Sequence, residues 1–193
     1  MPRLRGRDKP SRSDNRINVA IVPFGDIDLS TLRVLTGRLQ RLMGVQVEIV
    51  DAARIPDNSF APSRDQFLAE HFLSSLRRIV LQDGHMRVLG VTDKDLFAPG
   101  LNFVFGQALD RAAVISTRRL KPSEDTEEGN TLFQNRIVKE AVHELGHTLG
   151  LGHCPDPFCV MHFSNSIKDT DLKNEQFCGN CSAKAGSKIG REV

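Results

Sequence analysis

The segment His143-Glu-Leu-Gly-His147-Thr-Leu-Gly150-Leu-Gly-His153 is the most informative stretch of this 193-residue chain. His143 and His147 are four residues apart, so on a helix their side chains project from the same face, one turn above the other. If that helix continued, His153 would lie about 9 Å beyond His147 along the axis and on a different face. Gly150 predicts that the helix ends first, because glycine readily adopts the left-handed conformation that turns the chain back. We therefore expect the three imidazoles to converge.

Three neutral histidines are a ligand set typical of catalytic zinc. A zinc ion with three protein ligands keeps a fourth position open for water, lowers the pKa of that water to about 7 and polarises a carbonyl oxygen. Glu144 follows the first histidine, so we expect its carboxylate to lie over the metal, accept a proton from the water and pass it to a leaving amine. The pattern predicts a zinc-dependent hydrolase with Glu144 as the general base. The alternative, an amphipathic helix with histidines on its polar face, explains neither Gly150 nor His153.

All four cysteines of the chain follow this motif, as Cys154 and Cys159 and then Cys178 and Cys181. Two pairs with short internal spacings can close a tetrahedral zinc–thiolate site, which is structural because no coordination position stays open. Two disulfides are the competing interpretation. We see no apolar segment or cleavage site of a secretory signal at the N-terminus, so we expect a cytoplasmic protein with reduced thiols and favour zinc. A second zinc ion would then hold the segment that follows the histidine motif.

The histidine motif, the cysteine cluster and Met161 together resemble the archaemetzincins, a family of metzincin metallopeptidases. In metzincins a methionine turn lies as an apolar base beneath the three histidines, and Met161 stands where that turn belongs. The similarity extends upstream through residues 90–97, 103–108 and 113–120, and covers residues 17–181 in all.

The resemblance implies a zincin fold and a zinc metallopeptidase that hydrolyses peptide or protein substrates, with aminopeptidase-like action on short peptides. It also implies two zinc ions per chain. The catalytic ion would be held by His143, His147 and His153, and the structural ion by Cys154, Cys159, Cys178 and Cys181.

Two features depart from the family pattern. The segment between Met161 and Cys178 is about one residue shorter than the family spacing. The chain also contains no tyrosine, so it lacks the tyrosine that some other metzincins place near the zinc. Any further residue that stabilises the transition state must therefore be of another type.

Hydrophobic periodicity predicts an α/β fold. Strands and helices alternate along the first half of the chain, which favours a twisted, mostly parallel five-stranded sheet flanked by helices. The expected strands cover residues 17–24, 45–50, 87–92, 102–107 and 113–117. The expected helices cover residues 29–43, 63–78, a segment that starts at Asn130 or Thr131 after a loop at 120–129, and a short stretch near Asp169.

One expected strand carries a functional assignment. In zincins of this type an antiparallel edge strand pairs with the substrate backbone, and the resemblance assigns that role to Phe103, Val104, Phe105 and Gly106. The alternative is a plain structural edge strand.

Composition indicates one catalytic domain over residues 17–181, with a basic tail at 1–16 and a flexible tail at 182–193. Hydrophobic residues make up 39% and charged residues 26%, which is typical of globular proteins. No apolar run is long enough for a membrane span, so we expect no membrane partner, and a net charge of +2 gives no overall field that would favour nucleic acid. The basic tail could bind RNA, but a solvated tail is the interpretation that we favour.

Several alternatives remain open at this point. Glu140 shares a helical face with the histidines and could support them, although we favour a solvent-facing charge. Asp93 and Asp95 form either a loose carboxylate metal pair or an exposed turn after a strand. The rival function is a zinc-stabilised binding or regulatory module whose hydrolytic site is latent.

Overall fold

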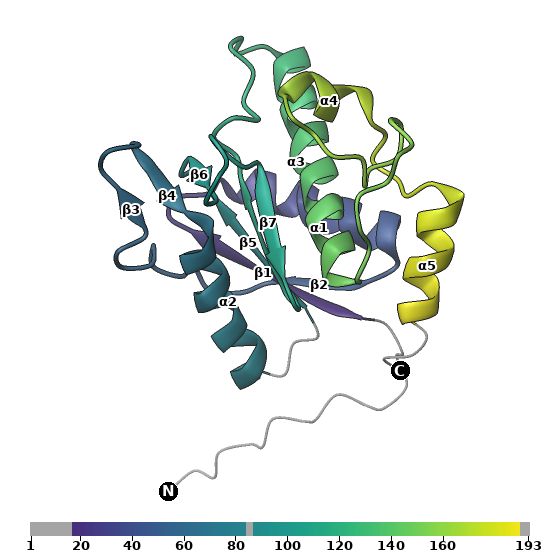
Figure 1. The fold of residues 1–193 in the computed structure, drawn as a ribbon, viewed down its shortest axis with the longest axis horizontal. Helices are drawn as coiled ribbons and strands as arrows, with labels where there is room; N and C mark the ends of the chain where they lie inside the picture. Colours follow the sequence, from purple (N-terminus) through teal and green to yellow (C-terminus); the bar gives the residue numbers. More distant parts are fainter. Residues whose placement is uncertain (1–16, 84–86, 190–193) are drawn as a thin grey trace, which may run out of the picture.

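The computed structural model describes residues 17–83 and 87–189 and contains a five-stranded sheet (Figure 1). The strand order is β2-β1-β5-β8-β7, in which the first four strands are parallel and β7 runs antiparallel to β8 at the edge. The mostly parallel sheet with an antiparallel edge strand is therefore confirmed. Residues 1–16, the expected basic tail, lie outside the described residues. The strands are β1 (Asn18–Phe24), β2 (Gln46–Ile49), β5 (Arg87–Thr92), β7 (Gly106–Leu109) and β8 (Ala112–Ser116).

Three long helices cover the two faces of this sheet. They are α1 (Leu29–Met43), α2 (Ala69–Asp83) and α3 (Glu127–Thr148). α1 and α3 lie on one face, and α2 lies on the other, as Figure 1 shows.

Strand β1 is buried on both sides by these helices. Val19 and Ile21 belong to the apolar cluster that includes α1 and α3, whereas Ala20 and Val22 belong to the cluster formed with α2. Because alternate side chains of a strand point to opposite faces, a strand between two helix layers must be apolar at nearly every position. This requirement explains the continuous apolar run that the sequence shows here.

Helix α3 begins earlier than the sequence analysis predicted. Its N-cap is Thr126, whose hydroxyl accepts a hydrogen bond from the backbone N–H of Gly129 at 3.0 Å. Glu127 and Glu128 lie in the first turn, where the positive end of the helix dipole favours acidic side chains. The start at Asn130 or Thr131 was wrong because these glutamates were assigned to a solvated loop.

A second, three-stranded sheet was not predicted. It consists of β3 (Phe60–Ala61), β4 (Gln66–Leu68) and β6 (Leu96–Phe97), in the order β3-β4-β6. The helix expected at residues 63–78 consequently begins only at Ala69. Strands of two or three residues are too short to show a period, and β6 comes from a distant part of the chain, so local sequence carried no signal for this sheet.

The C-terminal part contains α4 (Ile167–Leu172) and α5 (Gly179–Ile189). Residues 182–189, which we expected in a flexible tail, belong to α5, and Ala185 of this helix is buried against the main apolar cluster. Across residues 17–83 and 87–189, none of the helices has the length and apolar character needed to cross a lipid bilayer.

Candidate active site

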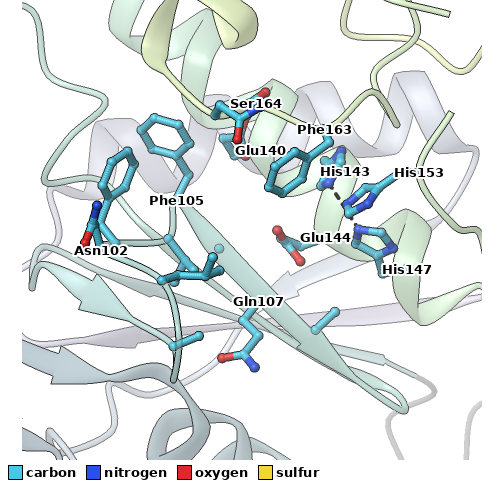
Figure 2. Close-up of a pocket in the computed structure, with 17 residues that line it drawn as sticks. Asn102, Phe105, Gln107, Glu140, His143, Glu144, His147, His153, Phe163 and Ser164 are labelled. Carbon is cyan, nitrogen blue, oxygen red and sulfur yellow. Dashed lines mark hydrogen bonds between the residues drawn. The ribbon is translucent and has the colours of Figure 1, made fainter. Parts of the chain in front are cut away.

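The three histidines of the motif converge at the end of α3 (Figure 2). His143 and His147 project from the last two turns of the helix, which ends at Thr148. Gly150 then adopts the predicted left-handed conformation, with φ of 79°, and the chain returns to place His153 beside the other two rings. One ring nitrogen from each histidine lies within 4.8 Å of the others.

Backbone carbonyls fix the orientation of two of these rings. Nδ1 of His143 lies 2.7 Å from the carbonyl oxygen of Val160, and Nδ1 of His147 lies 2.8 Å from that of Leu151. A carbonyl oxygen can only accept, so each Nδ1 carries the proton and donates it. Each Nε2 therefore presents a lone pair to the site, in the tautomer that binds a metal.

The two Nε2 atoms face each other at 3.1 Å. Two lone pairs at this distance repel and cannot share a hydrogen bond, so the arrangement favours a cation between them. Two nitrogens that each lie about 2.0–2.1 Å from a tetrahedral zinc ion are about 3.3 Å apart. The geometry of His143 and His147 therefore fits zinc.

Burial keeps the histidines neutral. It lowers the pKa of His143 to about 2, an effect to which the nearby charge of Lys173 adds. Burial is also the main cause that lowers the pKa of His147 and of His153. Neutral imidazole is the form that binds metal ions, so no proton has to be displaced near neutral pH.

Glu144 lies in the same cleft, on α3, and is buried. It packs directly over strand β7, because a Cβ added at Gly106 would lie 2.6 Å from Cγ of Glu144. Burial raises the pKa of Glu144 well above its ordinary value, the negative charge of Glu140 raises it further, and Lys173 opposes both. The carboxyl group is therefore held in a dry position that favours proton uptake.

Met161 lies beneath the helix and is fully buried. A Cβ added at Gly146, between the first two histidines, would lie 2.4 Å from the sulfur of Met161. The carbonyl of Met161 accepts a hydrogen bond from the backbone N–H of Cys154 at 2.9 Å. The turn that contains Met161 thus contacts both α3 and the segment that carries His153.

The four cysteines form a second cluster, with all four sulfur atoms within 4.8 Å of one another and none in a disulfide. Sγ of Cys154 lies 3.8 Å from Sγ of Cys178. Two sulfurs that are each about 2.3 Å from a tetrahedral zinc ion are also about 3.8 Å apart. The cluster therefore fits a zinc–thiolate site.

The thiols of this cluster differ in acidity. A hydrogen bond from the backbone of Cys181 is the main cause that lowers the pKa of Cys178 to about 7. Burial raises the pKa of Cys159 and that of Cys181. Cys159 and Cys181 would therefore need a bound cation beside them to lose their protons near neutral pH.

A cleft of about 480 Å³ opens beside the histidines (Figure 2). The residues proposed from the sequence to contact substrate, Phe103, Val104, Phe105 and Gly106, all line it. The rings of Phe103 and Phe105 pack edge to face with centroids 5.2 Å apart. Sequence reasoning missed two exposed apolar residues of the cleft, Leu101 and Phe163.

The edge strand is shifted relative to the prediction. We expected residues 102–107, but β7 begins at Gly106. The carbonyls of Leu101 and Asn102 accept hydrogen bonds from the side chain of Arg64, each at 2.9 Å, instead of pairing within the sheet. Phe103, Val104 and Phe105 therefore precede the strand, although Val104 bridges to Leu96 and the carbonyl of Phe105 accepts a hydrogen bond from the backbone N–H of Ser116 at 2.8 Å.

Glu140 is buried, so the solvent-facing interpretation was wrong. Its Oε1 lies 3.0 Å from Nζ of Lys173 in an ion pair and accepts a hydrogen bond from the hydroxyl of Thr170 at 3.0 Å. Lys173 is itself buried and is the C-cap residue of α4, directly after Leu172. It is remote from the motif in sequence, and no local pattern identified it. Burial of two charges is compatible with folding here because each compensates the other.

Comparison with known proteins is consistent with this geometry. The family described as Peptidase family M54 matches residues 26–186. An archaemetzincin of Pyrococcus furiosus is 41% identical over 181 residues, which cover 90% of this chain and 94% of that protein. An archaemetzincin of Methanopyrus kandleri is 48% identical over 131 residues, or 67% of this chain and 71% of that protein.

Solved structures show the same likeness. The crystal structure of archaemetzincin from Methanopyrus kandleri has a TM-score of 0.82 and 38% identity, and covers 95% of this chain and 100% of its own. That of archaemetzincin from Archaeoglobus fulgidus, complexed with malonate, has a TM-score of 0.76 and 37% identity, with coverage of 87% and 99%.

The buried ion pair generates a stability prediction. Lys173→Met leaves the carboxylate of Glu140 buried without a counter-charge, which should lower the free energy of unfolding by about 3–5 kcal/mol. The double variant Glu140→Gln with Lys173→Met should recover most of this loss, because no uncompensated charge remains. Urea denaturation measures the free energy of unfolding of both variants.

Lys168→Met, at an exposed position of α4, is the matched control. Equal stability of all four proteins would show that the pair is not compensating.

Proposed function

Because the chain belongs to peptidase family M54, the archaemetzincins, and is a zinc-dependent metallopeptidase, we propose that the three converging histidines hold its catalytic zinc ion. The ligand atoms in this proposal are one ring nitrogen each of His143, His147 and His153. The observation that carries it is the pair of Nε2 lone pairs that face each other at 3.1 Å. The proposal includes Glu144 as the general base.

The chain's own groups divide the work of peptide hydrolysis. When bound, zinc supplies a Lewis acid that polarises the scissile carbonyl and acidifies a water molecule. The carbonyls of Val160 and Leu151 hold two imidazoles in the binding tautomer. Glu144, whose raised pKa suits a base near neutral pH, takes the proton of the attacking water and delivers it to the leaving amine.

The substrate backbone is proposed to lie along the edge strand. β7 pairs with β8 on one side only, and within the described residues no further strand follows it in the sheet. An extended peptide can add to such an edge through main-chain hydrogen bonds. Phe103, Val104, Phe105 and Gly106 line the cleft at the start of this edge, which supports their role in substrate contact.

A second zinc ion is proposed at Cys154, Cys159, Cys178 and Cys181. The sulfur spacing supports it, as does the absence of disulfides among these residues. Cys154 directly follows His153, so the cluster would fix the chain at the third histidine. Met161 is proposed to support the site from below, since its sulfur packs against α3 at Gly146.

We propose aminopeptidase-like cleavage for this site. The family resemblance is its main support. Glu140, which also lines the cleft, is already paired with Lys173, and Glu144 is assigned as the general base, so neither carboxylate adds to that support.

Glu144→Gln tests the general base. The amide cannot accept the proton of water, so kcat should fall by about 10²–10⁴-fold while the zinc content stays at the wild-type value. Steady-state hydrolysis of a peptide library and metal analysis measure the two quantities. Glu70→Gln, at an exposed position of α2, should leave both unchanged. Full turnover by the Glu144 variant would refute the assignment.

Metal removal distinguishes a peptidase from a binding module. The wild-type protein should contain two zinc ions per chain, and a double Cys159→Ser, Cys181→Ser variant should contain one and unfold at a lower temperature, since metal binding stabilises the folded state. A chelator should abolish hydrolysis, and added zinc should restore it. One zinc per wild-type chain would contradict the structural site, and hydrolysis that survives the chelator would contradict the catalytic one.

Blocking the substrate N-terminus tests the mode of cleavage. If the free ammonium is recognised, N-acetylation of a short peptide should lower kcat/KM by more than about tenfold, because an unpaired polar group in the site is costly. Mass spectrometry of the products identifies the bond that is cut. Equal cleavage of acetylated and free peptides at internal bonds would establish an endopeptidase instead.

A further inference from the structure

One wall of the cleft is apolar and lacks regular secondary structure. We call residues 101–105 the aromatic wall, since Phe103 and Phe105 pack edge to face within it. Leu101 is 45% exposed, and Phe163, which also lines the cleft, is 42% exposed. Large apolar side chains left open to solvent around a concave site are typical of surfaces that bind a ligand.

We propose that the aromatic wall binds a large apolar side chain of the peptide next to the scissile bond, and that the Asp95–Arg119 ion pair positions this wall. The inference rests on the proposed peptidase function and adds its substrate class. Asp95 and Arg119 act through Phe103, so they are positioning residues.

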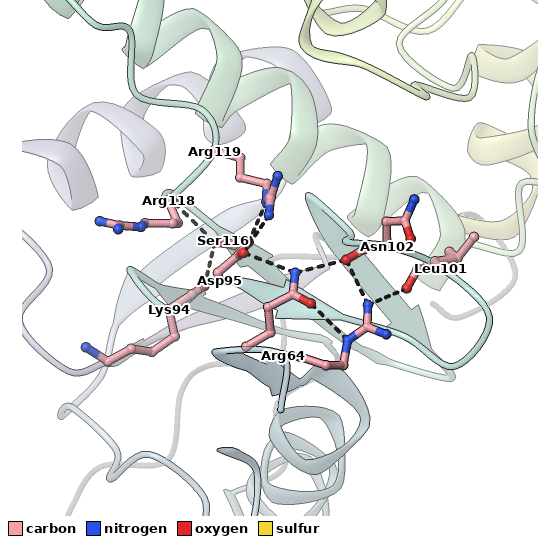
Figure 3. Close-up of polar contacts among 9 residues, drawn as sticks. Arg64, Lys94, Asp95, Leu101, Asn102, Ser116, Arg118 and Arg119 are labelled. Carbon is pink, nitrogen blue, oxygen red and sulfur yellow. Dashed lines mark hydrogen bonds and ion pairs between the residues drawn. The ribbon is translucent and has the colours of Figure 1, made fainter. Parts of the chain in front are cut away.

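The ion pair reaches the wall directly through Arg119. Its guanidinium donates two hydrogen bonds to the carboxylate of Asp95, from Nε at 2.6 Å and from Nη2 at 2.7 Å (Figure 3). The same guanidinium lies over the ring of Phe103, 4.4 Å from its centroid. Because the bidentate pairing fixes the plane of the guanidinium, it also fixes the ring that stacks on it.

The pair also reaches the wall through Gln66, which is buried. Its side-chain amide donates to Asp95 Oδ2 at 3.0 Å and to the carbonyl of Asn102 at 2.9 Å. Nε of Arg64 donates to Gln66 Oε1 at 3.0 Å, and its Nη2 donates to the carbonyls of Leu101 and Asn102 (Figure 3). The carboxylate of Asp95 thus holds the ring of Phe103 through Arg119 and the backbone of the aromatic wall through Gln66.

This network also decides between the two interpretations of Asp95 that the sequence left open. Burial alone would raise the pKa of Asp95, but the hydrogen bonds from Arg119 and Gln66 outweigh it and lower the pKa below its ordinary value. Both oxygens of Asp95 are engaged by these side chains. Asp95 therefore holds the aromatic wall in place, and its oxygens are not left free to form a metal site with Asp93.

A basic side chain is the competing occupant, because Glu140 lines the cleft. The charge of Glu140 is already compensated by Lys173, and its Oε1 also accepts from Thr170. The aromatic wall has no such internal partner on its open side, where Leu101 remains exposed. The cleft therefore favours an apolar side chain over a cationic one.

The test uses zinc-loaded protein and matched peptides with Phe, Leu, Ala, Lys or Glu at each position flanking the cut. The wild type should show its lowest KM for Phe or Leu at one flanking position. Arg119→Met should raise KM for the Phe peptide about fivefold, the size expected for loss of a partly desolvated cation–ring contact, and leave kcat and the Ala peptide nearly unchanged. Phe103→Ala should give a larger rise of the same kind.

Arg118→Met is the matched control, since it removes the same charge one residue away. Arg118 is exposed, and its side chain points away from the Asp95–Arg119 pair (Figure 3). It should leave all five peptides unaffected. Equal effects of Arg118→Met and Arg119→Met would overturn the positioning role, as would an equal loss for the Phe and Ala peptides.

A wild-type preference for Lys would overturn the apolar assignment. Titration calorimetry with the Glu144→Gln protein, which should bind without cutting, separates the inference from the proposed function. Tighter binding of the Phe peptide than of the Ala peptide there supports the aromatic wall even if the wild type hydrolyses nothing. Absence of hydrolysis by the wild type would refute only the proposed catalytic site. Equal binding of the two peptides would contradict the proposal that the aromatic wall binds an apolar side chain.

Discussion

The site depends on two backbone carbonyls that each accept a hydrogen bond from a histidine ring. The carbonyl oxygens of Val160 and Leu151 accept hydrogen bonds from the Nδ1–H groups of His143 and His147, so the Nε2 lone pairs of both rings are left facing each other. Repulsion between these lone pairs would spread the rings if nothing lay between them. Two ordinary hydrogen bonds therefore hold the rings in an arrangement that suits a cation. The rest of the structure keeps the two carbonyls in place.

The carbonyls are held from opposite directions. Leu151 follows the left-handed Gly150, so its position depends on where α3 ends. Val160 lies in the turn before Met161, and that turn is tied to Cys154 and contacts Gly146 of α3. Together these contacts fix the carbonyls of Val160 and Leu151 relative to α3. They come from the cysteine cluster, Met161 and Gly150. On the far side of the cleft, a separate polar network fixes the aromatic wall, so that the proposed metal site and the aromatic wall have independent supports.

The sequence was sufficient to predict those features that depend on one periodic segment or one motif. The strands of the main sheet, helix α1 and the turn at Gly150 followed from local patterns, because each of these elements is defined by residues close together in the sequence. Glu140 shows the limit of this reasoning. Its burial depends on the ion pair with Lys173, which follows α4. No residue near Glu140 in the sequence indicates that this lysine is its partner. The same holds for β4, which pairs with β6 from a distant segment, and for the late start of β7, which depends on hydrogen bonds from Arg64.

The most direct test of this account is a crystal structure of the zinc-loaded protein with anomalous scattering recorded at the zinc edge. The account predicts an anomalous peak about 2.0–2.1 Å from Nε2 of both His143 and His147 and from a ring nitrogen of His153, with a fourth position open toward Glu144 and held by solvent. A peak enclosed by four protein atoms, or rings that turn apart to leave no peak between them, would contradict it.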